Sequence, residues 1–180
     1  MLGGPSSDRN MRSMKERRSI AVALLIALVC CRSSVAEPVA AISGMVVDKS
    51  DRRLELLANG SPVRSYRVAL GRSPNGHKVQ EGDDRTPEGI YTIDGRNANS
   101  AFHRSLHVSY PNQQDRTRAA ELGVAPGGDI MIHGIRNGLG WVGRLHVAFD
   151  WTGGCIAVTN AEIEEIWYLV PNGTPIEIRP

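Results

Sequence analysis

Short runs of alternating apolar and polar residues cover most of the chain after residue 41, separated by turn-forming residues. Such alternation is typical of half-buried β-strands. Asn59-Gly60 lies between two of these runs and is a strong hairpin signal, because both residues tolerate positive φ. We therefore expect strands over 42–47, 54–58, 63–70, 89–93, 106–110, 130–133 and 176–178.

One later segment, 160–170, has helical periodicity instead. Its apolar residues recur at spacings of three and four, which predicts a helix with one apolar stripe. Asn160 is the expected N-cap, and the glutamates early in the segment suit the positive end of the helix dipole. The stripe consists of Ile163, Ile166, Trp167 and Val170.

Two further segments complete the predicted fold. A short helix is expected over 116–122. The segment 71–88, rich in Gly, Pro, Asp and charge, is predicted to be a long loop that forms a mobile wall of a cleft. Many short strands with one substantial helix predict a mostly-β fold, either a sandwich or a barrel-like single domain.

The first 36 residues have the pattern of an export signal. A basic stretch precedes 12 uninterrupted apolar residues over 20–31, and Ser34-Val35-Ala36 follows as a small-x-small cleavage site. We expect a signal peptide over 1–36 and one domain over 37–180, exported to the periplasm or cell envelope. Met14 is an alternative start. An uncleaved anchor is the other interpretation, although a membrane span needs about 20 apolar residues.

Charge and length change once this leader is removed. The chain has 21 Lys+Arg and 19 Asp+Glu. Six and two of these lie in residues 1–36, so 15 and 17 remain and the net charge becomes −2. Such a balance provides no electrostatic surface for nucleic acid. The remaining length is enough for one buried core without disulfides.

Cys155 is the residue with the clearest chemical potential. It is the only cysteine after the expected cleavage, so no disulfide partner is available. Gly153 and Gly154 precede it, and their N–H groups, with that of Cys155, are candidate oxyanion donors. His133, followed by Gly134, ends an apolar run and is the expected base. A thiol, a base and a glycine-lined turn are the parts of a cysteine acyl-transfer site, which predicts a thiol of depressed pKa.

Several residues have alternative interpretations. Thr152 can orient the imidazole or bind substrate, and His146, in an apolar stretch, is the alternative base. Cys155 can also be an inert buried residue, and His133 a structural histidine. His103 and His107 have the i, i+4 spacing of metal ligands, but they lie around an expected strand and lack further ligands. We therefore expect no metal and no organic cofactor.

The order of these motifs resembles the L,D-transpeptidase catalytic domain, the cysteine enzymes of bacterial cell-wall cross-linking. The resemblance covers about 42–179 and includes Val68-Ala69-Leu70-Gly71, Gly82-Asp83, Arg85-Thr86-Pro87-Glu88-Gly89-Ile90-Tyr91, Leu106-His107-Val108-Ser109-Tyr110-Pro111-Asn112 with Asp115, His133-Gly134, Gly154-Cys155-Ile156 and Asn160. The chain is a variant of the family signature. Gly153 replaces the histidine of Ser/Thr-His-Gly-Cys, and Ala157 replaces an arginine that follows.

The resemblance implies a mostly-β domain and a two-step reaction on peptidoglycan. Cys155 would be the nucleophile and His133 the proton acceptor and donor. The thiol would attack the carbonyl at the L-centre of a diamino acid in a donor tetrapeptide stem and expel D-alanine. An amine of an acceptor stem would then take the acyl group, with no cofactor. The missing arginine leaves open how a substrate carboxylate is held.

Two other functions remain open at this point. The first is a cysteine amidase or carboxypeptidase on the same fold, which hydrolyses a stem peptide or the linkage of a wall protein. The second is a non-catalytic peptidoglycan-binding module.

Overall fold

The computed structural model describes residues 41–180 together with Met1. The expected signal peptide, and with it Cys30 and Cys31, lies outside the described residues. Within the described part of the chain, no helix combines the length and the apolarity that crossing a membrane requires.

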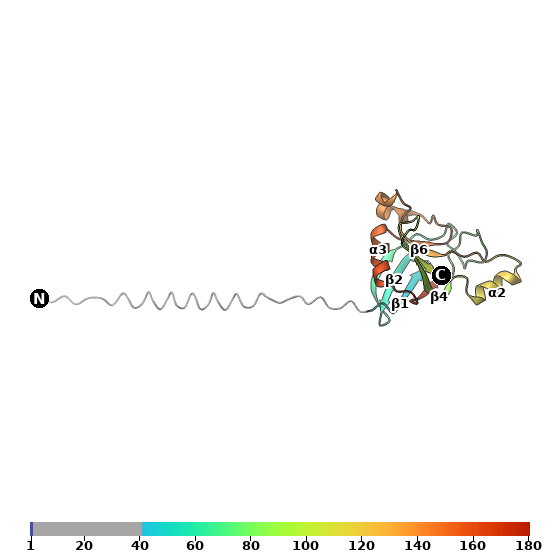
Figure 1. Cartoon of the computed structure of the whole chain (residues 1–180), viewed down its shortest axis with the longest axis horizontal. Helices are drawn as coiled ribbons and strands as arrows, with labels where there is room; N and C mark the ends of the chain where they lie inside the picture. Colours follow the sequence, from blue (N-terminus) through green and yellow to red (C-terminus); the bar gives the residue numbers. More distant parts are fainter. Residues whose placement is uncertain (2–40) are drawn as a thin grey trace. The chain divides into compact units, whose positions relative to one another are not determined.

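The described domain is built on one eight-stranded sheet with few helices (Figure 1). The spatial order of the strands is β3-β2-β1-β8-β4-β5-β6-β7, and most neighbours are antiparallel. The pairs β1–β8 and β6–β7 are parallel. The strands are β1 (Gly44–Asp48), β2 (Arg53–Ala58), β3 (Ser61–Arg67), β4 (Gly89–Asn97), β5 (Ser105–Val108), β6 (Met131–His133), β7 (Ile156–Ala157) and β8 (Pro175–Arg179).

The two ends of the sheet are joined, which gives the domain its barrel-like character. Ala69, just after β3, exchanges two backbone hydrogen bonds with Ala157 of β7, at 3.0 and 2.8 Å. A second bridge joins Gly71 and Thr152. The predicted mostly-β fold is confirmed, and the sheet is curled on itself.

All seven expected strands are present with shifted ends. The third ends at Arg67, not at 70, and the two-residue β7 was not expected. Along β2 the side chains alternate between buried and half-buried, so the alternation seen in the sequence does mark the core face. The buried core includes Leu54, Leu56, Ile93, Leu106 and Ile132.

The C-terminal helix α3 (Asn160–Leu169) packs Ile163 and Ile166 into this core. Its N-cap is Thr159, and the expectation of Asn160 was wrong by one residue. Thr159 Oγ1 accepts a hydrogen bond from the N–H of Glu162, whose carboxylate accepts one from the Thr159 N–H, forming a capping box.

The remaining helical segments differ from expectation. Helix α2 (Gln113–Glu121) begins three residues before the expected start, because Asn112 and Asp115 form a second capping box. In Figure 1, α2 lies on the side of the domain away from α3. The segment Gly140–Ala148 forms a 3-10 helix, η1, interrupted at Gly143 by a positive φ of 52°.

Candidate active site

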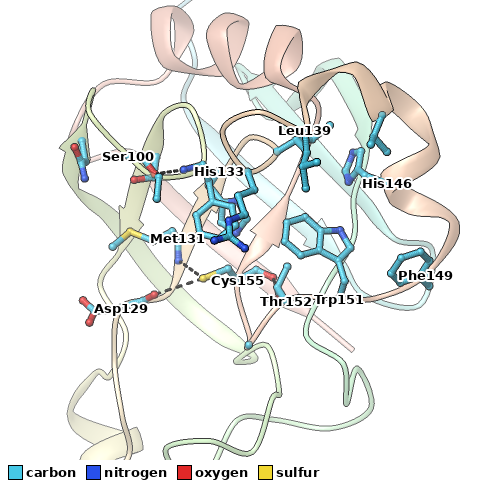
Figure 2. A pocket seen from close by; sticks show the side chains of 18 of the residues that line it. Ser100, Asp129, Met131, His133, Leu139, His146, Phe149, Trp151, Thr152 and Cys155 are labelled. Carbon is cyan, nitrogen blue, oxygen red and sulfur yellow. Dashed lines mark hydrogen bonds between the residues drawn. The ribbon is translucent and has the colours of Figure 1, made fainter.

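A pocket of about 780 Å³ opens beside β6 and the start of β7, and Cys155, His133 and His146 all line it (Figure 2). Most of its other lining residues are apolar or small. They include Ala101, Phe102, Met131, Ile135, Leu139, Val142, Leu145, Phe149, Trp151, Thr152 and Gly153. The fold thus brings the expected nucleophile and both candidate bases to one cavity.

Strand pairing positions Cys155. Residues Ile132 and Ile156 are partners in the parallel β6–β7 pair, so the residue before β7 lies beside the start of β6. The Cys155 Sγ accepts a hydrogen bond from the Met131 N–H at 3.4 Å and donates to the Asp129 carbonyl oxygen at 3.5 Å (Figure 2).

This environment raises the pKa of the Cys155 thiol. Burial is the main cause, and the negative charge of Asp129 adds to it. The Met131 N–H acts in the opposite direction. The depressed thiol pKa expected from the sequence is therefore wrong for the free protein, whose thiol is protonated at neutral pH.

His133 ends β6 and is buried. Its Nδ1 lies 2.6 Å from the carbonyl oxygen of Gly134 and donates to it, which assigns the lone pair of the ring to Nε2. Burial lowers the pKa of His133, so the imidazole is neutral. The ring is held between Phe102 and Trp151, at centroid distances of 4.6 and 5.7 Å. Among the described residues no hydrogen bond joins this ring to Sγ.

Thr152 supports the turn that carries the nucleophile. Its Oγ1 donates to the Cys155 carbonyl oxygen at 2.7 Å and accepts from the Gly154 N–H at 3.1 Å. The Gly154 N–H is therefore engaged within the turn. Within residues 41–180 no acceptor pairs with the N–H of Gly153 or Cys155, so these two groups are available to bind an anion.

Gly154 cannot carry a side chain in this turn. Its φ is +124°, and an added Cβ would lie 2.6 Å from the Arg85 carbonyl oxygen. The turn thus packs directly on the 71–88 loop. No described residue of that loop lines the pocket, so its expected role as a wall of the cleft was wrong. The loop instead packs against the turn outside the pocket. An ion pair between Lys78 and Asp83, at 2.8 Å, stabilises the loop itself.

Asp150 is a supporting residue that the sequence analysis missed. Its Oδ1 accepts from the Leu70 N–H at 2.9 Å, and its Oδ2 accepts from Arg52 at 2.8 and 3.1 Å. These bonds fix the start of the Asp150–Cys155 segment against the sheet. An acidic residue directly before the Trp-Thr-Gly-Gly-Cys run was the available signal.

Gly134 and Asn160 anchor the chain after His133. The Gly134 N–H donates to the Phe102 and Arg104 carbonyl oxygens, and the Ile135 N–H donates to Asn160 Oδ1 at 2.8 Å. A Cβ at Gly134 would lie 2.8 Å from that same amide oxygen. Gly134 therefore acts through close packing, and the Asn160 side chain is committed to this loop.

His146 also reaches the pocket, from the 3-10 helix η1. It is buried, burial lowers its pKa, and neither ring nitrogen has a hydrogen-bond partner within the described chain. In Figure 2 it lies near Leu139 and Phe149, away from Cys155. The structure thus places His133 nearer the expected nucleophile.

The two histidines with metal-like spacing have separate partners. His103 Nε2 lies 2.7 Å from Glu164, and His107 Nδ1 pairs with Asp94. Over residues 41–180, no group of three or more His, Cys, Asp or Glu side chains is arranged to hold a metal ion.

With this geometry established, comparison with known proteins identifies the family. The sequence profile of the L,D-transpeptidase catalytic domain (YkuD) matches residues 43–178. The chain belongs to the L,D-transpeptidase catalytic-domain family. This confirms the resemblance found in the sequence.

Individual L,D-transpeptidase relatives are distant. YafK of Escherichia coli (strain K12), named as an L,D-transpeptidase, is 28% identical over 128 residues, which cover 68% of this chain and 44% of YafK. The chain therefore spans less than half the length of this relative.

Solved structures support the fold. The helical cell shape determining protein Pgp2 from Campylobacter jejuni superposes with a TM-score of 0.59 at 22% identity, over 78% of this chain and 48% of Pgp2. Bd1075 from Bdellovibrio bacteriovorus gives a TM-score of 0.55 at 24% identity, over 80% and 50% of the two chains.

Proposed function

We propose that this protein is an L,D-transpeptidase that acts on peptidoglycan stem peptides through a Cys155 thioester. The observation that carries the proposal is the single pocket in which Cys155, His133 and two unpaired N–H groups meet, within a chain of this family. Residues 1–36 export the chain, and the domain over 37–180 works in the periplasm or cell envelope.

The first half-reaction forms the acyl-enzyme. The thiol attacks the carbonyl at the L-centre of the diamino acid in a donor stem. A C–S bond forms, and the amide bond to the terminal D-alanine breaks. Nε2 of His133 takes the thiol proton and delivers it to the departing amine. In the free protein both the thiol and the imidazole are neutral. The thiolate and imidazolium, which are unfavourable in a buried site, then form only during the reaction.

The oxyanion of the tetrahedral intermediate is bound by the N–H groups of Gly153 and Cys155. Loss of one such donor typically costs about 10²–10³ in rate. In the second half-reaction the amine of an acceptor stem attacks the thioester, and neutral His133 removes its proton. The C–S bond breaks as the new amide bond forms, and His133 returns the proton to the Cys155 sulfur. The result is a cross-link between two diamino acids, formed without metal or organic cofactor.

The proposal is tested by mass spectrometry of muropeptides after purified peptidoglycan is incubated with the protein or with Cys155→Ala. New cross-links between diamino acids that require Cys155, together with a Cys155-bound acyl mass, are the expected result. The thermal transition of Cys155→Ala, compared with that of the wild type, controls for loss of folding.

Two results would overturn it. Shortened stems or released wall protein, without new cross-links, would identify water as the acceptor and the protein as a hydrolase. Identical muropeptides from both proteins, with binding to peptidoglycan retained, would identify a binding module.

A further inference from the structure

The pocket contains one acidic and one basic side chain among its described lining residues, Asp129 and Arg136. They bracket β6, the strand that carries His133. Within residues 41–180 neither side chain has an ion-pair or hydrogen-bond partner. Several other arginines of the domain are paired, for example Arg52 with Asp150 and Arg72 with Asp84.

The backbone around Arg136 is fixed although its guanidinium is unpaired. The preceding N–H, of Ile135, donates to Asn160 Oδ1 at 2.8 Å. The following N–H, of Asn137, donates to the Ala101 carbonyl oxygen at 2.9 Å, and the Arg136 carbonyl oxygen accepts from the Leu139 N–H at 2.9 Å. An anchored backbone reduces the entropy lost when the guanidinium binds a ligand.

Asp129 lies beside the nucleophile. Its carbonyl oxygen is 3.5 Å from the Cys155 Sγ, and its φ of 53° is the left-handed conformation that Asp and Asn tolerate. Its negative charge contributes to the raised pKa of the Cys155 thiol. A cation bound to Asp129 would therefore remove an interaction that disfavours the thiolate.

The arginine of the family signature is replaced here by Ala157, and a residue at this position cannot contact a ligand in the pocket. Ala157 is fully buried in β7 and pairs with His133 of β6. Arg136 lies three residues after His133, in the loop that follows β6. It lines the pocket from there, so a guanidinium is supplied from the loop after β6 in place of β7.

We propose that Asp129 and Arg136 together recognise a zwitterionic amino-acid end, with the ligand's ammonium at Asp129 and its carboxylate at Arg136. The inference rests on the proposed function, and the ligand is the far end of the donor-stem diamino acid. Guanidinium binds carboxylate through two parallel hydrogen bonds. The site would thus prefer a stem whose diamino acid ends in an ammonium and a carboxylate over one that ends in a bare ammonium.

Binding is measured in the Cys155→Ala background, so that no turnover is needed, with synthetic tetrapeptide stems. Two stems differ only at the far carboxyl group of the diamino acid, which is either free or a carboxamide. The free acid is expected to bind about tenfold or more tightly. Arg136→Gln should reduce this preference to less than about twofold. Arg144→Gln, an arginine of η1 outside the pocket lining, should preserve it.

Asp129→Asn tests the other half of the pair, because two readouts should move in opposite directions. Asparagine keeps the tolerance for positive φ. Alkylation of Cys155 by iodoacetamide in the otherwise wild-type free protein should become faster at a given pH. Affinity for the stem with a free far ammonium should fall, and affinity for its N-acetylated form should not. A merely structural defect would move both affinities together.

The proposal is overturned if Arg136→Gln and Asp129→Asn keep the wild-type preferences. Tighter binding of free D-alanine than of the stem would also overturn it, because the zwitterion recognised would then be a free amino acid. These affinity outcomes are independent of Cys155-dependent turnover, so failure of the proposed reaction is recognised separately.

Discussion

Burial keeps the Cys155 thiol protonated in the free protein by raising its pKa, and the nearby negative charge of Asp129 adds to this effect. A buried thiolate with a carboxylate close by is costly, so the resting nucleophile is a poor target for electrophiles and oxidants. In the proposed reaction, reactivity would depend on the substrate, which would exclude water, place its carbonyl beside Sγ and allow His133 to take the proton. Without a ligand, the raised pKa makes Cys155, the only cysteine among the described residues, less reactive.

This arrangement predicts how the thiol reacts with iodoacetamide. Because burial raises its pKa, native Cys155 should alkylate more slowly than the unfolded chain at pH 7–8.5. Its rate should continue to rise above pH 8.5, about the pKa of an ordinary thiol. Mass spectrometry of quenched samples measures both rates, with the guanidinium-unfolded protein as control. Equal rates for native and unfolded protein at pH 7 would contradict the prediction.

At the scale of elements, the loop after β6 and the start of α3 form one unit. Thr159 caps the helix, and the neighbouring Asn160 turns its amide to Ile135 of the loop. Of these two adjacent polar side chains, Thr159 stabilises the helix and Asn160 holds the loop that lines the pocket. The stability of the helix and the geometry of the site can therefore be separated by mutation.

Thr159→Ala should lower the free energy of unfolding by about 1 kcal/mol, the usual cost of losing a cap, and leave stem binding largely intact. Asn160→Ala should weaken stem binding, because it frees the backbone next to Arg136. Chemical denaturation and calorimetric affinity in the Cys155→Ala background provide the two measurements. If both variants lose affinity equally after allowance for stability, the division of roles is wrong.

The sequence predicted the elements whose residues alternate regularly and missed those whose form depends on tertiary contacts. The two residues of β7 are too few to show alternation. In η1, Trp141 and Leu145 are exposed, so the apolar positions there do not mark a core face. Asn160 and Thr159 are both good caps in sequence, and only the loop contact decides between them. The pKa of the Cys155 thiol is raised because the thiol is buried, and the spacing of residues in the sequence does not reveal this burial.

At the scale of the whole molecule, the site depends on closure of the sheet. The Ala69–Ala157 bonds join its two ends, and Cys155 lies two residues before this junction. The pocket itself encloses His133 and His146 as neutral rings, since burial lowers the pKa of both. The integrity of the fold is therefore linked to pH.

The free energy of unfolding should decrease as pH falls from about 6.5, because the unfolded chain then binds protons at these two histidines that the native protein does not. The loss should continue until pH reaches the lowered native pKa values. His146→Gln should flatten the slope between pH 6.5 and 5, a window above the titration of most carboxylates. Urea denaturation at a series of pH values measures how the free energy of unfolding depends on pH. If this dependence is the same in His146→Gln as in the wild type, His146 is not a buried neutral ring.

The strand β8, which joins the two halves of the sheet between β1 and β4, is also the last element along the chain. Residue 45 must find residue 176 before these halves meet, and pairings of such long sequence separation form late in folding. A chain that is synthesised from its N-terminus thus cannot complete its sheet until nearly all of the described residues have been added. Under the export proposed above, this order of assembly would leave the chain unfolded during passage across the membrane, and the Cys155 thiol would acquire its neighbours only afterwards.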